Sequence, residues 1–159
     1  MEHAHHADGT WRTAFSATLH CLTGCAIGEV LGMVIGTALG WSGVATIALA
    51  VALAFLFGYL LTSLPLLRSG LALGAVVPIA LAADTVSIAV MEVVDNAVVV
   101  AVPGAMDAGL GDPLFWGSLA GALAIAFAVA LPLNRWLIGR GRGHAVAHAH
   151  HAGHGAAGA

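Results

Sequence analysis

The stretch HCLTGCAIGEVLGMVIGTALG, at residues 20–40, decides how this chain is to be read. It is apolar enough for a membrane-spanning helix, yet it contains a histidine, two cysteines, a glutamate and a glycine at every fourth position. The rest of the chain is similarly apolar, because 60% of its 159 residues are hydrophobic and only 8% are charged. A soluble domain carries about 25% charged residues. The composition therefore predicts an integral membrane protein whose main partner is the lipid bilayer.

Four apolar blocks follow one another, at about residues 13–39, 44–67, 71–102 and 113–138. A helix that crosses a bilayer needs about 20 apolar residues, whereas a strand of a membrane barrel has only about 10. We therefore predict an all-α, polytopic membrane protein with four transmembrane helices in one domain, residues 11–142. A His-containing tail, residues 1–10, precedes this domain, and a tail rich in His, Gly and Ala, residues 143–159, follows it.

The third block is too long for one straight span. A helix of about 32 residues would extend about 48 Å, against a hydrocarbon core of about 30 Å. Pro78 and the pair Asp84 and Thr85, which could act as an internal cap, favour an interruption within about residues 77–84. We expect a single interrupted or kinked span, because two full crossings would separate the C-terminal arginines from the other basic residues.

Two helix starts have local signals. Asp112 followed by Pro113 is typical of an N-cap with proline at the first helical position. Ser69 and Gly70 could cap the third helix in the same way.

The basic residues indicate the orientation. There is no lysine, and with four spans all five basic residues fall on one side of the membrane: Arg12, Arg68, Arg135, Arg140 and Arg142. Because positively charged loops stay on the cytoplasmic side, we predict that both termini are cytoplasmic. The tryptophans fall at the membrane interfaces in this topology, which are Trp11 and Trp136 inside and Trp41 and Trp116 outside.

The glycines of the opening stretch recur at every fourth position: Gly24, Gly28, Gly32, Gly36 and Gly40. This spacing places them along one ridge of a helix, where another helix can approach at backbone distance. We predict a packing role for them. The neighbour is open, since it could be another span of the same chain or the same helix of a second chain.

Four acidic residues fall inside the apolar blocks: Glu29 in the first, and Asp84, Glu92 and Asp95 in the third. An ionisable group at the centre of a bilayer costs about 2.5–3.5 kcal/mol, and no basic residue lies in a span interior to pair with these. They must be protonated, face water, share protons or hold a cation. Because the first and third spans run in the same direction, we expect Glu29 and Asp84 to reach a similar depth.

A structural role is the alternative for these acids. Protonated carboxyl groups, together with Asn96, could hydrogen-bond neighbouring helices, and Asp84 could cap a broken helix. Both interpretations stay open from the sequence.

Cys21 and Cys25 lie one helical turn apart and face the same way. Two thiolates at this spacing could hold Cu(I), or Zn(II) with further ligands. His20 points about 100° away from Cys21, so an unbroken helix would not bring all three to one ion. Packing beside the glycines is the competing interpretation of the two thiols.

Histidines gather in both tails: His3, His5, His6, His144, His148, His150, His151 and His154. Short His-rich tracts are typical of metal capture, since imidazole suits Zn, Cu, Ni and Fe. The alternative is a polar tail with no specific role.

Three segments carry a resemblance to a known family. They are LHCLTGCAIGEVLGMVIG at residues 19–36, AADTVSIAVMEVVDNAVVVAVPGAM at 82–106, and FWGSLAGALAIAFAVALPLNRWLIGRGRGHAV at 115–146. Together the chain resembles, over residues 11–146, a group of small bacterial membrane proteins catalogued as domain of unknown function 4396. The resemblance implies a bacterial four-helix membrane protein, but the family brings no settled activity.

A shorter likeness links VVDNAVVVA, at residues 93–101, to the Asp-Asn membrane motif of the tellurium-resistance and manganese-export family. The rest of the chain does not follow that family's layout. This likeness implies a cation near Asp95 and Asn96.

These patterns favour a protein of the bacterial inner membrane that binds and transports a transition-metal cation, such as Cu, Zn, Ni or Mn. In this hypothesis Glu29, Asp84, Glu92, Asp95 and Asn96 form the intramembrane site and His20, Cys21 and Cys25 a relay beside it. The alternative is a non-transporting accessory or assembly subunit that docks through its glycines, as a homodimer or in a larger membrane complex. We expect no enzymatic activity, since no catalytic motif is present, and no nucleic-acid partner, since there is no basic surface.

Overall fold

The structure is a computed structural model that describes the backbone of residues 2–139 and the side chains of residues 11–139, apart from those of 79 and 83. Every regular element in this part of the chain is helical: α1 (Glu2–Ala38), α2 (Gly43–Arg68), α3 (Leu73–Ala101), the short 3-10 helix η1 (Ala105–Asp107) and α4 (Pro113–Gly139). The all-α prediction is therefore confirmed for residues 2–139. Helix α1 begins at Glu2, so residues 2–10 are helical.

Three helices are long and apolar enough to cross a membrane, at Trp11–Ala38, Gly43–Arg68 and Pro113–Gly139. Helix α3 is bent by 44° between Leu73–Ala82 and Asp84–Ala101, and it is a fourth candidate if these two pieces form one span. The bend falls inside the interval 77–84, where the sequence predicts an interruption.

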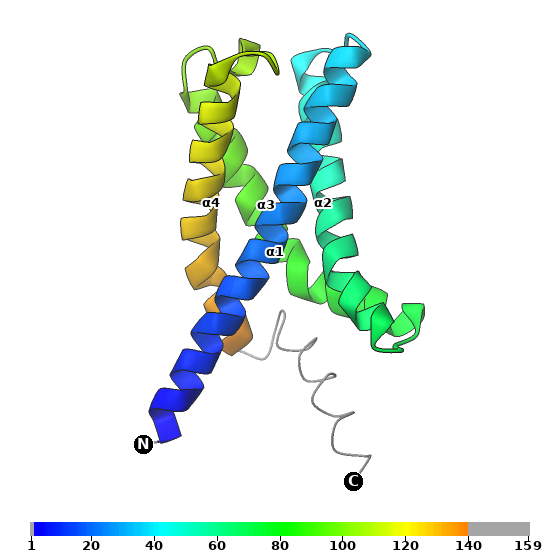
Figure 1. The fold of residues 1–159 in the computed structure, drawn as a ribbon, viewed down its shortest axis with the longest axis vertical. Helices are drawn as coiled ribbons and strands as arrows, with labels where there is room; N and C mark the ends of the chain where they lie inside the picture. The colour runs from blue at the N-terminus through cyan, green and yellow to red at the C-terminus, as the bar shows by residue number, and fades with distance from the viewer. Residues whose placement is uncertain (1, 140–159) are drawn as a thin grey trace.

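The four long helices run alternately up and down (Figure 1). The start of α1, the end of α4 and the connection between α2 and α3 lie at one end. The three arginines with described side chains, Arg12, Arg68 and Arg135, belong to helix segments at this end, which we call the arginine end. The connection from α1 to α2 and the connection through η1 lie at the other, which we call the η1 end. Helices α1 and α3 therefore run in the same direction.

The two predicted helix starts have different outcomes. Asp112 accepts a 2.8 Å hydrogen bond at Oδ1 from the backbone N–H of Leu114, so the predicted cap of α4 is confirmed. The prediction for Ser69 and Gly70 is wrong, because these residues end α2 and α3 begins only at Leu73. Ser69 donates its hydroxyl back to the carbonyl oxygen of Leu66 at 2.7 Å, and Gly70 has a φ of +90°, a conformation that stops a helix.

Helix α1 packs against α2 through a row of glycines, which are Gly24, Gly28, Gly32 and Gly36. The approach is at backbone distance: a Cβ built at Gly24 would lie 2.7 Å from the Cα of Gly58. Gly40 is not part of the row, since it lies in the turn after α1 with a φ of +64° and nothing within 4 Å of a Cβ. The neighbour that the sequence left open is thus another helix of the same chain. A partner protein could reach this row only by separating α1 from α2.

Candidate functional site

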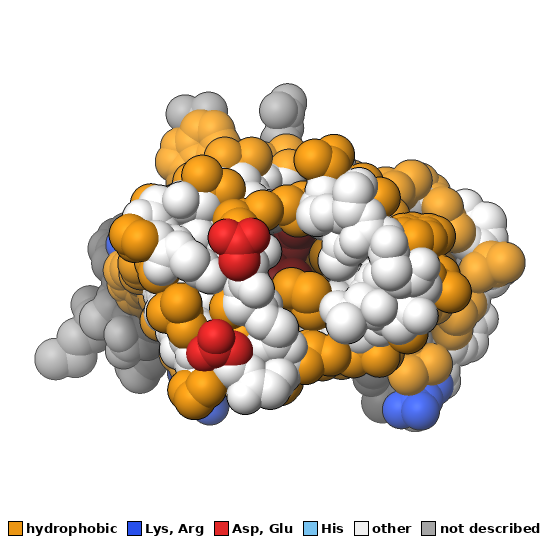
Figure 2. Space-filling view, turned by 90° about the horizontal axis from the view of Figure 1, so that it is seen from above, with side chains coloured by type: hydrophobic (Ala, Val, Ile, Leu, Met, Phe, Trp, Pro, Cys, Tyr) orange, Lys and Arg blue, Asp and Glu red, His pale blue; other side chains and the backbone are white. Residues whose placement is uncertain are grey.

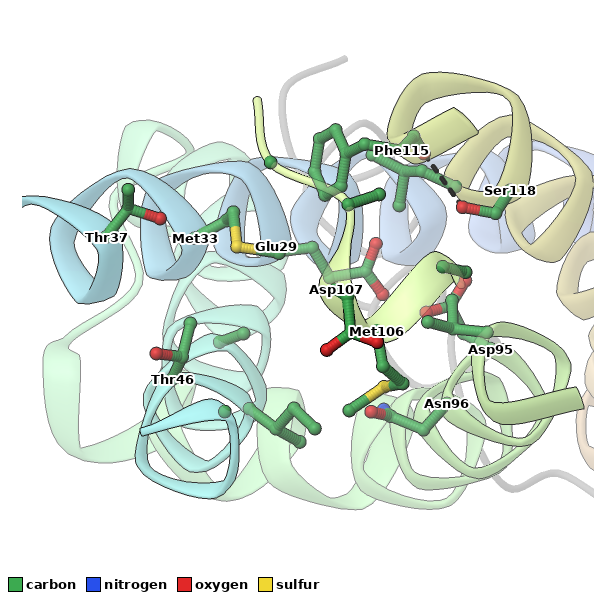
Figure 3. A pocket seen from close by; sticks show the side chains of 18 of the residues that line it. Glu29, Met33, Thr37, Thr46, Asp95, Asn96, Met106, Asp107, Phe115 and Ser118 are labelled. Atoms are coloured by element: carbon green, nitrogen blue, oxygen red, sulfur yellow. Dashed lines mark hydrogen bonds between the residues drawn. The ribbon is translucent and has the colours of Figure 1, made fainter. Parts of the chain in front are cut away.

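A vestibule of about 370 Å³ opens at the η1 end of the bundle. Seen from that end, the surface is hollowed, and acidic side chains appear in the depth of the hollow (Figure 2). The carboxyl groups of Glu29, Glu92 and Asp95 line it together with the amide of Asn96. Asp107, from η1, is also part of the lining, and the labelled acidic side chains come from α1, α3 and η1 (Figure 3). The sequence-predicted acids are thus gathered at one cavity, with the exception of Asp84.

The three deep carboxyl groups are buried, and most of their oxygens have no hydrogen-bond partner among the described residues. The exposed fractions of the Glu29, Glu92 and Asp95 side chains are 9%, 4% and 5%. Both carboxyl oxygens of Glu29 and of Glu92, and Oδ1 of Asp95, have no hydrogen-bond partner among the described residues. Leaving one buried polar group unsatisfied costs about 1–3 kcal/mol. The vestibule therefore presents an unfilled set of oxygen acceptors.

No positive charge balances these acids from within the described bundle. Arg12, Arg68 and Arg135 are all exposed, and Arg135 lies over the ring of Trp11, 4.0 Å from its centroid. The vestibule floor can therefore be neutralised by bound protons or by a cation that enters it.

Helices α1 and α3 face each other through three pairs of side chains. In each pair, one side chain comes from α1 and the other from α3. The Cys21 thiol donates to Oδ1 of Asp84 across 3.8 Å. Cys25 lies beside Glu92, and Glu29 interacts directly with Asp95. We call these the three donor pairs. The residues of α1 share one stripe because four residues make slightly more than one helical turn.

The depth expected for Glu29 was wrong. Asp84 lies level with Cys21, and Glu29 lies two turns further toward the η1 end, level with Asp95. Both helices run in the same direction with a rise of about 1.5 Å per residue. The eight residues from Cys21 to Glu29 therefore place Glu29 about 12 Å further along α1 than Cys21.

His20 is not part of the cluster. Its side chain is exposed, whereas Cys21 and Cys25 are free thiols buried in the core. Asn96 turns its amide nitrogen to the backbone oxygen of Glu92, at 2.8 Å. Among the residues with described side chains, no group of three or more His, Cys, Asp and Glu is arranged to hold a metal ion. The Cys, Asp and Glu side chains between α1 and α3 are therefore arranged in pairs.

The histidines of the two tails fall outside what the structure describes. The side chains of His3, His5 and His6 belong to the part of α1 whose side chains are not described, and His144, His148, His150, His151 and His154 follow residue 139. Metal capture by the tails stays a prediction.

Several residues of the vestibule were missed from the sequence. Met33 and Thr37 continue the stripe of Cys21, Cys25 and Glu29 at the same spacing of four, and both line the vestibule. That spacing was a usable signal. Met106 lines the vestibule from η1, and its place depends on a connection whose path the sequence does not predict.

Toward the arginine end the interior is closed by a polar pair. Asn134 of α4 donates a 2.8 Å hydrogen bond to the hydroxyl of Thr18 on α1, and both side chains are buried. Thr18 in turn donates to the carbonyl oxygen of Ala14 at 2.7 Å. Ala14, Ala17 and Ala130 are fully or almost fully buried around them. The buried polar groups thus face a vestibule at one end and a packed layer at the other.

Residues 10–143 match the family described as domain of unknown function (DUF4396), and the chain belongs to this family. The match covers nearly all of the helical bundle, so the family identification predicted from the three quoted segments is confirmed. No curated protein and no solved structure matches the chain.

Proposed function

We propose that this chain is a four-span protein of the bacterial inner membrane that binds a transition-metal cation at the floor of its vestibule and passes it across the membrane. Glu29, Glu92 and Asp95 are the binding residues in this proposal. Asn96 and Asp107 assist at the wall of the cavity. Cu, Zn, Ni and Mn are the candidate cations, and the tail histidines capture the ion before or after passage.

One observation carries the proposal: the carboxyl groups of Glu29, Glu92 and Asp95 are at least nine-tenths buried and line one cavity, and both oxygens of Glu29 and Glu92 and Oδ1 of Asp95 have no hydrogen-bond partner among the described residues. Ionisable groups at membrane depth normally face a partner or a water-filled path, because an isolated one is costly. A cation is the partner that carboxyl oxygens accept most readily.

The proposed topology places α3 as one bent span, with both termini and the arginine end in the cytoplasm. It is supported by the distribution of arginines, since Arg12, Arg68 and Arg135 belong to the end opposite to the vestibule. The vestibule then opens to the outer side of the membrane. A cation would enter from there and meet Glu29 and Asp95 first.

Metal titration of purified full-length protein in detergent tests the proposal, in a background where the eight tail histidines are replaced by asparagine. Calorimetry with Mn²⁺ and Zn²⁺ measures the binding. The protein with an otherwise wild-type sequence should bind about one cation per chain. Glu29→Gln and Asp95→Asn should each weaken binding by about tenfold or more, equivalent to about 1.4 kcal/mol.

Asp112→Asn is the matched control. Asp112 is exposed and only caps α4, a role that asparagine also fills. Its affinity should equal that of the wild type. Absence of cation binding in the wild type, or equal affinities in Glu29→Gln and wild type, would refute the proposal.

A further inference from the structure

The sulfur atoms of the chain are not scattered over it. The sequence has four methionines and two cysteines, and those with described side chains lie in the vestibule or in the core beneath it. Met33 and Met106 line the vestibule. Met91, Cys21 and Cys25 belong to one buried cluster, each with an exposed fraction of 1%. Met33 is half-buried, whereas Met106 is 44% exposed.

These sulfurs and the carboxyl groups lie along the same path. The stripe of α1 reads Cys21, Cys25, Glu29, Met33 from the core to the vestibule, with Asp84, Glu92 and Asp95 of α3 opposite. The sulfur of Met33 lies next to the Glu29 side chain, and Met106, Asp107, Asn96 and Asp95 line the same cavity (Figure 3). We call this set the sulfur–carboxyl column.

The chemistry of the column selects among cations. Carboxylate, carbonyl and water oxygens suit Mg²⁺, Ca²⁺ and Mn²⁺, whereas thiolate and thioether ligands select softer ions such as Cu(I) and Zn²⁺. Oxygen alone would have been enough to hold a hard cation. A path that offers sulfur at its mouth, beside its acids and in its core favours an ion that binds sulfur.

We propose that the cation of this site belongs to the soft and borderline class, with Met33 and Met106 receiving it and the pairs of Cys25 with Glu92 and Cys21 with Asp84 carrying it inward. This inference rests on the proposed function, because it names the class of ion that the vestibule takes. Met91 belongs to the same buried cluster as the two thiols.

The pairing of donors is consistent with passage of an ion. Conduction requires several sites, each strong enough for entry and weak enough for release. Each donor pair supplies two protein ligands, so water or a neighbouring thioether completes the coordination. A closed site of four protein ligands would be typical of a structural zinc ion, which stays bound.

The test compares Cd²⁺, as a soft probe, with Mn²⁺ and Ca²⁺ on full-length protein with the eight tail histidines replaced by asparagine. Cd²⁺ should bind about tenfold or more tightly than Mn²⁺ and resist a large excess of Ca²⁺. Binding should also produce the ultraviolet absorption of a thiolate bound to Cd²⁺. Cys21→Ser with Cys25→Ser should remove this band, and Met33→Leu, which conserves volume, should lower the preference for Cd²⁺ by several-fold.

His20→Ala is the matched control, since His20 precedes Cys21 on the same helix but is exposed. It should bind Cd²⁺ as the wild type does. Two results would overturn this inference: the protein binds the ions without preferring Cd²⁺, or its preference for Cd²⁺ survives both the cysteine and the Met33 substitutions. In either case the sulfurs are packing groups, and the carboxyl site stands. If no ion binds at all, the proposed function fails with it.

Discussion

The Cys21 thiol and the Asp84 carboxyl group meet across 3.8 Å, although 63 positions separate them in the sequence. The contact sets the level of α3 against α1 at the innermost of the three donor pairs. Asp84 is the first residue after the bend of α3, so the contact also ties the piece Asp84–Ala101 of that helix to α1.

Loss of the thiol donor should destabilise the bundle. Cys21→Val keeps the volume nearly constant but removes a donor to a buried carboxyl oxygen, which costs about 1–3 kcal/mol. We expect the unfolding temperature in detergent, followed by tryptophan fluorescence, to fall for Cys21→Val. Cys21→Ser keeps a hydroxyl donor at the same place and should retain most of the stability. Equal losses in the two variants would show that packing around Cys21 matters more than its contact with Asp84.

The glycine row should tolerate no large side chain. At Gly28 a Cβ would meet the backbone of Ala54, so Gly28→Leu must push α1 away from α2. Overpacking of a core typically costs about 1–3 kcal/mol. Gly121→Leu is the matched control, because a Cβ at Gly121 of α4 meets nothing within 4 Å. Thermal unfolding should show a clear loss for Gly28→Leu and little change for Gly121→Leu. Similar stability in both would contradict the close approach of α1 and α2.

Residue-specific labelling should show the vestibule open at one end. In a Cys21→Ser, Cys25→Ser background, a cysteine at Thr37, which lines the vestibule, should react with a water-soluble maleimide. A cysteine at Ala17, which is buried beside the Thr18–Asn134 layer, should react far more slowly. Mass spectrometry of the purified protein gives the labelled fraction. Comparable rates at the two positions would mean that the arginine end is also open.

The proposed topology predicts the side of the membrane on which each end lies. A reporter that is active only in the cytoplasm, such as a fluorescent protein, should be active when fused to either terminus. A periplasmic phosphatase should be active when inserted at Gly109, in the connection after η1. Phosphatase activity at the C-terminus would place the arginine end outside and reverse the proposed direction of the vestibule.

Much of the helical framework follows from the sequence, and the reasons are local. Long apolar blocks define the helices to within a few residues at most ends, and Asp112 with Pro113 marks the start of α4. The role of Ser69 and Gly70 was misjudged because these residues can either start or stop a helix. The choice between these depends on where the chain turns, which neighbouring helices decide.

The candidate site was only partly predictable. The cost of burying charge singles out Glu29, Glu92 and Asp95 without any knowledge of the fold. Their partners depend on how α1 and α3 are aligned along their length. For this reason Glu29 was matched in depth with Asp84, whereas it lies level with Asp95. Met33 and Met106 escaped notice because a thioether in an apolar segment resembles ordinary packing.

The alignment of α1 with α3 also limits how this family of chains can vary. The three donor pairs depend on the number of residues between Cys21 and Glu29 as much as on which residues these are. One inserted residue would rotate every later side chain of α1 by about 100° and turn Glu29 and Met33 away from α3. A substitution along the stripe alters one of these side-chain pairs. An insertion or deletion within residues 21–33 instead misaligns every pair that follows it along α1. The length of that segment is therefore a stricter requirement than its composition.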